Sequence, residues 1–338
     1  MKRLLFSAVI VALSITSACS NSVEQSNSDY EQEVRSEESK EEAAFLHPLT
    51  GLPSKVKVDT RPYAVMVNNH PKARPQSGLH QADIVYELLA EGHVTRFLAI
   101  FQSEQPEVIG PVRSARDYYI DLSKGYDALY VSHGWSPSAK EKLTSGEADY
   151  LNGLFYDGTL FWRDDTRKAP HNSYISFANM EKGAEKKGYS TTEEVPPIPF
   201  AKENVNDSGS AMPEFTVQYD DSPTWTIQYE YDDELARYKR YSGDELTVDR
   251  DTKDPVLISN IFVVEMEHKI IDNYGRRNID VYTGGNGYLF QHGQMREVEW
   301  KNIDGRILPY ENGDPVPFVP GRTWINVVPD LNKMLRLP

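Results

Sequence analysis

The sequence predicts an α+β protein, with a layered N-terminal domain at residues 46–200 and a smaller, antiparallel β-rich C-terminal domain at residues 212–338. The first region mixes apolar strand-like runs with helix signals, and one hairpin in it is apolar on both faces. The second region carries alternating strands and closely spaced turn signals. A stretch rich in Pro, Asn, Asp and Ser, from Glu193 to Ser210, marks the boundary between them.

Residues 1–18 predict a secretory signal peptide. A basic head precedes a short apolar run, Leu4 to Ile15, well below the roughly 20 residues that span a bilayer core. The small residues before Cys19 resemble a bacterial lipobox, although Thr16 stands where Leu, Val or Ile is usual. We therefore expect Cys19 to be lipidated and to anchor the protein at the extracytoplasmic face of the cell membrane.

The lipidated cysteine and a disordered tether are predicted to fill residues 19–45, where Ser, Glu, Gln and Asn leave too little apolar surface for a core. The chain has 36 basic and 51 acidic side chains, a net charge of −15, which argues against nucleic acid as a partner. With Cys19 as the single cysteine, no internal disulfide can form. Because HExxH and paired histidines on one helix are absent from the sequence, we expect no metal and no cofactor.

The hairpin in ADIVYELLAEGHVTRFLAIF is the most readable element. If Glu91-Gly92 is its turn, Glu87 lies opposite Arg96 and Tyr86 opposite Phe97. Because both faces are mainly apolar, the two strands should lie in the interior of a sheet that is covered on both sides. Glu87 and Arg96 would then form a buried ion pair, or else serve in catalysis.

Buried strands are also predicted at Tyr63–Val67 and Ala128–Ser132. A helix is expected from Ser114 to Ser123, with Ser114 and Asp117 as a capping box, and another at Phe177–Lys187. The β-rich region shows strand-like runs at Phe215–Tyr219, Trp225–Tyr231 and Ile258–Met266. Its turn signals are Gly284–Gly287, His292-Gly293, Asp304-Gly305 and Asn312-Gly313.

Arg113 and Arg116 are the strongest candidates for binding. Both lie at the predicted helix N-terminus, where backbone N–H groups already carry positive charge, so helix formation gives no reason for them. A bound anion would compensate that charge. The alternative is structural pairing with Asp117, Asp121 or another carboxylate.

Three further segments carry polar residues that a core would not require. Asn68–His70 and His133–Ser136 each follow a predicted strand, a common place for ligand groups in layered α/β domains. The third is the run from Arg163 to Asn172. GxSxG and SxxK motifs are absent, so a hydrolase would have to use His133 or His171 with Glu87 or Asp117 as general acid and base.

Several motifs occur in order along the chain, namely RPYAVMVNN, GPVRSARDYY, HGWS, FWRD and APHN. A C-terminal run from GRRNIDVYTGGNGYLFQHG to PGRTWINVVP follows them. In these motifs the chain resembles the YerB-like family of bacterial lipoproteins. The resemblance extends over nearly everything after residue 46. It implies a membrane lipoprotein with a sheet-sheet-helix N-terminal domain and a smaller β-rich one. It implies no established activity.

Our interpretation is a membrane-anchored lipoprotein that binds an anionic or glycan ligand of the cell envelope. The predicted ligand-binding residues are Arg96, Arg113, Arg116, His133, Trp135, Arg163, His171 and Asn172. An envelope hydrolase and a scaffold that binds another envelope protein through the C-terminal domain are the alternatives.

Overall fold

The computed structural model describes residues 45–202 and 209–338. The predicted signal peptide, the lipidation site Cys19 and the tether through residue 44 lie outside these residues. Within the described ranges, no helix combines the length and the hydrophobicity needed to cross a membrane.

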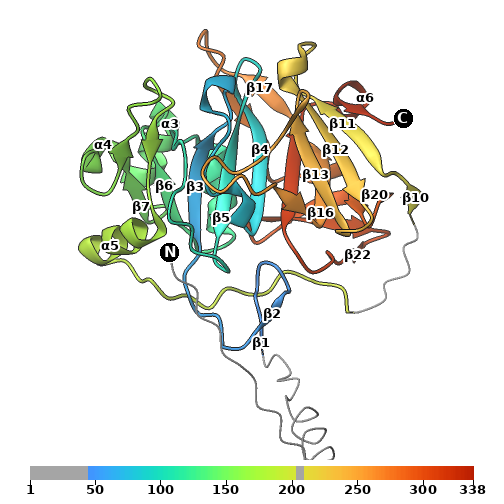
Figure 1. Ribbon diagram of the computed structural model, residues 1–338, viewed down its shortest axis with the longest axis horizontal. Coiled ribbons are helices and arrows are strands. Elements are labelled where there is room, and N and C mark those ends of the chain that lie inside the picture. Colours follow the sequence, from blue (N-terminus) through green and yellow to red (C-terminus); the bar gives the residue numbers. More distant parts are fainter. Residues whose placement is uncertain (1–44, 203–208) are drawn as a thin grey trace, which may run out of the picture. The chain divides into compact units, whose positions relative to one another are not determined.

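A twelve-stranded mixed sheet runs through the molecule (Figure 1). Its strands follow one another in the order β22-β21-β20-β19-β16-β23-β4-β5-β3-β6-β7, and β10 pairs with β20. Their bounds are β3 Tyr63–Asn68, β4 Ile84–Glu91, β5 Val94–Phe101, β6 Leu129–Ser132, β7 Tyr150–Asn152, β10 Ser210–Ala211, β16 Asn260–Glu265, β19 Gly285–Gln291, β20 Gln294–Ile303, β21 Arg306–Glu311, β22 Asp314–Pro315 and β23 Thr323–Val328.

Strand β23 joins the N-terminal and C-terminal parts of this sheet. It runs parallel to β16 on one side and to β4 on the other, with Trp324 opposite Val85 and Ile325 opposite Tyr86. The two regions expected from the sequence therefore contribute strands to one continuous sheet.

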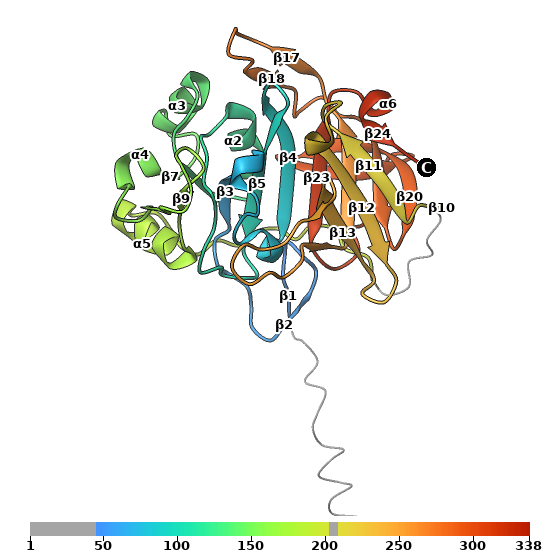
Figure 2. The same ribbon diagram turned by 45° about the horizontal axis from the view of Figure 1, so that its top comes forward.

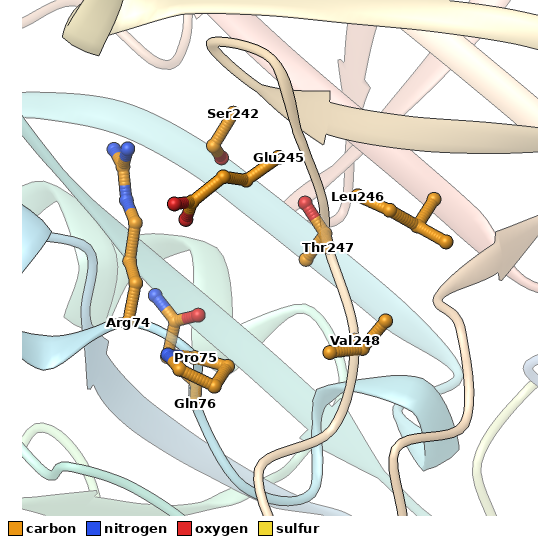
Figure 3. Close-up of a pocket in the computed structure, with 8 residues that line it drawn as sticks. All are labelled: Arg74, Pro75, Gln76, Ser242, Glu245, Leu246, Thr247 and Val248. Atoms are coloured by element: carbon orange, nitrogen blue, oxygen red, sulfur yellow. The ribbon is translucent and has the colours of Figure 1, made fainter.

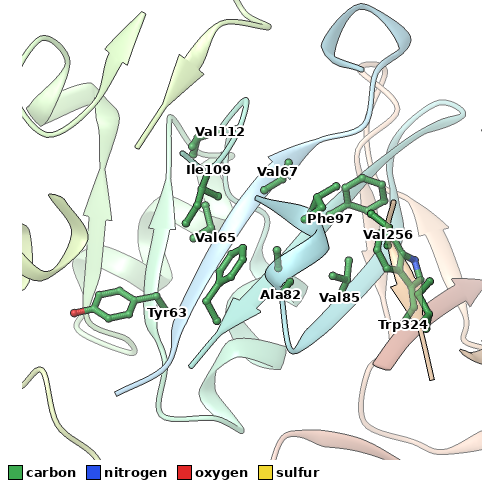
Figure 4. Packing of buried hydrophobic residues seen from close by; sticks show 14 of the residues in the cluster. Tyr63, Val65, Val67, Ala82, Val85, Phe97, Ile109, Val112, Val256 and Trp324 are labelled. Carbon is green, nitrogen blue, oxygen red and sulfur yellow. The ribbon is translucent and has the colours of Figure 1, made fainter. Parts of the chain in front are cut away.

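A second, antiparallel sheet covers one face of the central sheet (Figure 2). Its strands are β11 Glu214–Gln218, β12 Thr226–Asp232, β13 Arg237–Ser242, β14 Glu245–Leu246, β15 Leu257–Ile258 and β24 Leu335–Arg336. Phe215 of this sheet stacks on Phe290 of β19, with 3.6 Å between ring centroids. The same buried cluster contains Val85, Phe97 and Trp324 (Figure 4).

Helix α2 packs on the opposite face, which completes the sheet-sheet-helix layering. The Tyr119 hydroxyl donates to the Leu88 and Arg96 carbonyls, and the Tyr118 hydroxyl donates to the Leu89 carbonyl. The helices are α2 Asp117–Lys124, α3 Pro137–Thr144, α4 Gly153–Tyr156, α5 Phe177–Lys187, α6 Leu331–Met334, and the 3₁₀ turns η1 Pro71–Ala73, η2 Leu79–Gln81 and η3 Pro223–Trp225. The small hairpins are β1 Phe45–Leu46 with β2 Pro53–Ser54, β8 Trp162–Arg163 with β9 Ser173–Tyr174, and β17 His268–Ile270 with β18 Arg277–Ile279.

Several predicted elements are confirmed. The strands β3 and β6 are buried along their whole length, and α5 occupies the predicted residues and ends at Gly188 in the left-handed conformation. His292-Gly293, Asp304-Gly305 and Asn312-Gly313 all have positive φ at both residues, as type I′ hairpin turns require.

The predicted register of the β4–β5 hairpin is wrong by one residue, although both strands do lie in the sheet interior. The turn is at Gly92-His93 rather than Glu91-Gly92, which shifts the pairing of the strands. A bulge between Leu89 and Glu91 then reverses part of that shift. Glu87 is therefore opposite Phe97, and Arg96 is opposite Leu88. Because alternate residues of a strand face opposite sides, Glu87 and Arg96 lie on opposite faces of the sheet.

The predicted start of the α2 helix is also wrong. Arg116 is the N-cap residue, and Ser114 caps nothing, because its hydroxyl donates to the His133 carbonyl. The chain before Arg116 is extended: Val112 bridges to Val67, and Ala115 bridges to Trp135. In an extended segment, side chains three residues apart point to opposite sides, which separates Arg113 from Arg116.

Candidate functional site

The candidate site lies where three parallel strands end. Strands β3, β6 and β7 run in the same direction, so their carboxyl ends bring Asn68–His70, His133 and Asn152 to one edge of the sheet. The β8–β9 hairpin contributes Arg163 and Ser173, and the loop that joins its strands contributes His171 and Asn172.

His133 is held between a hydroxyl and a guanidinium. Its Nε2 lies 2.8 Å from Arg163 Nη2, and its Nδ1 lies 2.7 Å from Ser173 Oγ. A guanidinium only donates, so Nε2 accepts and the ring proton is on Nδ1, donated to Ser173. Burial and then the charge of Arg163 lower the pKa of His133, so the ring is neutral at neutral pH.

Gly153 is required for this position of His133. A Cβ added at Gly153 would overlap the imidazole ring, so the ring rests directly on the backbone that follows β7. Asn152 fixes the same backbone, because its Oδ1 accepts from the N–H groups of Gly134 and Leu154 at 2.9 and 3.0 Å.

His70 and His171 form a stacked pair, with ring centroids 4.6 Å apart. Asn68 positions both: its Oδ1 accepts from the His70 backbone N–H, and its Nδ2 donates to His171 Nδ1 at 2.9 Å. His70 Nδ1 accepts from the Lys72 backbone N–H. In the neutral rings the proton of each histidine is therefore on Nε2 and remains available to a ligand.

Arg113 supplies the uncompensated charge of this site. Its side chain is partly buried, and within the described chain it has no carboxylate partner or side-chain hydrogen bond. Burial, and then the charge of Arg96, lower its pKa to about 10. Its charge in turn contributes to the lowered pKa of His70, His133 and His171.

The pKa of His171 is lowered most, to about 4. Burial is the largest cause, followed by the positive charges of His70 and Arg113. A bound anion would reduce this cationic repulsion.

The other predicted arginines have partners. Glu91 pairs with both Arg96, at 2.7 Å, and Arg116, so these two form a structural cluster on the α2 side of the sheet. Arg163 pairs with Asp157 at 2.9 Å and also donates to Asn172 Oδ1 at 3.2 Å. The pairing alternative therefore holds for Arg116, whereas Arg113 lies among the histidines.

The candidate carboxylates are elsewhere. Glu87 is fully buried and accepts hydrogen bonds from four side chains, namely Asn69, Thr95, Arg240 and Trp324. Asp117 is the first residue of α2. Among the described residues, neither carboxylate hydrogen-bonds to His133 or His171.

Trp135 lies on the rim next to His133. Its ring is 5.6 Å from Phe155 and 6.1 Å from Tyr150, centroid to centroid. Phe155 and its neighbour Leu154 are 62% and 56% exposed, so this rim is apolar and open to solvent.

The sequence did not identify every residue of the site. It marked Asn68–His70 as a polar loop but gave no sign that His70 stacks on His171, because that contact joins distant segments. Nothing in the sequence indicated Ser173 or Gly153. Among the described residues, no group of three or more His, Cys, Asp or Glu side chains is placed to hold a metal ion.

The fold defines a class of two-part α+β protein with a shared central sheet, and the candidate site of Arg113 and three histidines lies at the ends of its parallel strands. The chain belongs to the DUF3048 family, described as proteins of unknown function: its N-terminal domain matches residues 49–190 and its C-terminal domain residues 215–325. This confirms the resemblance noted in the sequence.

Among its relatives is the Bacillus subtilis (strain 168) protein named "Putative lipoprotein YerB". The two are 54% identical over 289 residues, which cover 84% of this chain and 86% of that protein. The crystal structure of YerB protein from Bacillus subtilis is also similar, with a TM-score of 0.81 and 52% sequence identity. That match covers 85% of this chain and 98% of the crystallised one.

Proposed function

We propose that this protein is an extracytoplasmic lipoprotein, anchored to the cell membrane through Cys19, that binds an anionic group of a cell-envelope ligand at Arg113. The relative's printed name and the lipobox-like residues before Cys19 support the anchor. The uncompensated charge of Arg113 supports the anion site.

The single observation that carries the binding proposal is a partly buried cation without a counter-ion. Removing a charge from water is costly, and proteins normally offset that cost with a partner. Arg96, Arg116 and Arg163 each have a carboxylate partner, whereas no described carboxylate pairs with Arg113, whose charge acts on His70, His133 and His171. An anionic ligand would supply the missing partner.

The neighbouring groups suit an anion. No described group accepts from the Nε2–H groups of His70 and His171, so together with the Arg113 guanidinium they offer donors from three side chains. The exposed aromatic rim at Trp135 and Phe155 would suit a sugar or other apolar face attached to that anion.

Calorimetric titration with a poly(glycerol phosphate) chain tests the site, with a neutral chitooligosaccharide for comparison. The anion should bind, and Arg113→Gln should weaken it by about tenfold or more, the loss of one charged contact. Arg336→Gln, which removes an exposed arginine of β24, is the control and should bind like wild type. Equal weakening by both variants would indicate nonspecific charge attraction and reject the site.

The anchor has its own test. Cys19→Ala should release the protein into the medium or leave the precursor unprocessed, because the lipid attachment is lost. A variant that is processed and retained like wild type would contradict the anchor.

The hydrolase alternative has weaker support. A general base must reach the proton that it removes, and neither Glu87 nor Asp117 hydrogen-bonds to a histidine of the site. The Ser173–His133 contact is also unsuited to a nucleophile, because Arg163 donates to His133 and directs the ring proton toward Ser173.

A protein-binding scaffold has one observation in its favour. The β17–β18 hairpin and its surroundings expose Ile270, Ile271, Tyr274 and Tyr282 at 55% to 78%. Crosslinking in cells from position 274, compared with position 235 on another exposed loop, would show whether a protein partner contacts this hairpin.

A further inference from the structure

A cavity lies between the segment that follows η1 and the chain that runs through β14 and just beyond it (Figure 3). Its volume is about 220 Å³, and its polar lining consists of Arg74, Gln76, Ser242, Glu245 and Thr247. Pockets for drug-sized ligands measure roughly 300 to 1,000 Å³. This cavity therefore suits a smaller molecule.

Three side chains of the lining have donors that no described group uses. Arg74 donates from Nε to Asn69 and from Nη1 to Thr224, but its enclosed Nη2 has no acceptor. The Ser242 and Thr247 hydroxyl oxygens accept from Arg240 at 2.8 and 2.9 Å, and neither hydroxyl donates to a described group. These donors match a carboxylate.

Acceptors come from the two remaining polar side chains. Gln76 Nε2 donates to the Asn68 carbonyl and to Asn69 Oδ1, which leaves its Oε1 free within the described chain. The exposed carboxylate of Glu245 forms no ion pair with any described residue, although it lies in the same cavity as Arg74 (Figure 3). These acceptors match an ammonium group.

The separation of Arg74 from Glu245 is informative. Opposite charges that line one small cavity would gain energy by direct pairing, yet these two do not form a salt bridge. A molecule with one charge of each sign could contact both. The Ser242 and Thr247 hydroxyl oxygens are held in place by Arg240, which is itself paired with the buried Glu87.

We infer that this cavity binds a zwitterionic α-amino acid. Its carboxylate takes the donors of Arg74, Ser242 and Thr247, and its ammonium group faces Glu245 and Gln76. Leu246 and Val248 add apolar walls for a small side chain. This site is separate from the Arg113 site and does not depend on it.

Titration calorimetry of the full-length protein in detergent tests the inference with three probes: L-alanine, propionate and ethylamine. Propionate carries only the carboxylate and ethylamine only the ammonium. L-Alanine should bind about tenfold or more tightly than either, because only it satisfies both ends. If propionate binds as tightly as L-alanine, or if L-alanine does not bind at millimolar concentration, the inference is wrong.

A matched pair of variants localises the binding. Glu245→Gln should weaken L-alanine by about tenfold and leave propionate unchanged, because only the ammonium contact is lost. Asp244→Asn removes the neighbouring exposed carboxylate, which does not line the cavity, and should change neither affinity. Equal effects of the two substitutions on L-alanine would overturn the assignment.

Discussion

Two charged clusters of this molecule differ in how their hydrogen-bonding capacity is used. Around Glu87, both carboxylate oxygens have donors, and the Arg240 guanidinium packs against the rings of Phe97 and Trp324, at 5.3 and 4.9 Å from their centroids. Arg113 has no counter-ion in the described chain, and its charge acts on His70, His133 and His171. The paired charges at Glu87 stabilise the fold, whereas the missing counter-ion of Arg113 is the basis for the proposed anion site.

Breaking the satisfied cluster should have the largest effect. Arg240→Met leaves the Glu87 carboxylate buried and unpaired, so the free energy of unfolding should fall by about 3 to 5 kcal/mol. Urea denaturation measures this. The double variant Glu87→Gln/Arg240→Met should recover part of the loss, because no lone charge remains. A single-variant loss below about 1 kcal/mol would show that the pair does not hold the two sheets together.

Arg116 and Arg113 form a matched pair three residues apart. Arg116→Gln removes a charged partner of Glu91 and should lower the free energy of unfolding by roughly 1.5 to 3 kcal/mol. Arg113→Gln should leave the melting temperature unchanged or raise it slightly, because the site loses a charge without a partner. Thermal melting compares the two, and a larger drop for Arg113→Gln would reverse our assignment of the two arginines.

Gly153→Ala tests the packing of the His133 ring against the backbone at Gly153. The added methyl overlaps the imidazole, so the ring must move, at a cost of about 1 to 3 kcal/mol for overpacking. The His133 resonances in an NMR spectrum should shift, and affinity for phosphate should fall. Leu154→Ala changes the next, exposed residue and should leave those resonances in place.

Acidification should lower the free energy of unfolding of the ligand-free protein through its histidines. We expect this effect to be the smallest of those predicted. His171 has a pKa of about 4 when folded against 6.5 for a free histidine, so the unfolded chain binds more protons between these values. The free energy of unfolding is therefore unaffected by this group above pH 6.5 and decreases as the pH falls toward 4.

The comparison of melting temperatures at pH 7 and pH 5 checks the sign. The wild type should lose more than His171→Gln, and added phosphate should reduce the loss by offsetting the positive charge. His292→Asn, in an exposed turn that tolerates positive φ, serves as control and should behave like wild type. Equal losses in wild type and His171→Gln would contradict the assignment.

The elements that local pattern determines could be predicted from the sequence. The buried strands β3 and β6, the helix α5 and the type I′ turns follow from apolar runs, caps and glycine positions. The hairpin register could not, because the bulge between Leu89 and Glu91 leaves no sign in the sequence. Because of this one-residue error, the sequence predicted Arg96 as the partner of Glu87. In the structure Glu87 faces the second sheet and pairs with Arg240.

The candidate site could be predicted only in part, for a similar reason. The position of His133 after a buried strand is a local feature that the sequence shows, and His171 was indicated by the polar run that contains it. Which arginine lacks a carboxylate depends on Glu91, whose contacts with Arg96 and Arg116 follow from tertiary structure.

The position of β23 also constrains how the chain can be made and shortened. Synthesis from the N-terminus produces Ile84–Glu91 long before Thr323–Val328, so one edge of β4 stays unpaired until most of the chain has been made. Closing that pair spans most of the sequence, which makes it a slow, late step of folding. Deleting even the last few strands would expose the apolar edges of both β4 and β16, and the truncated chain should aggregate rather than persist as an N-terminal fragment.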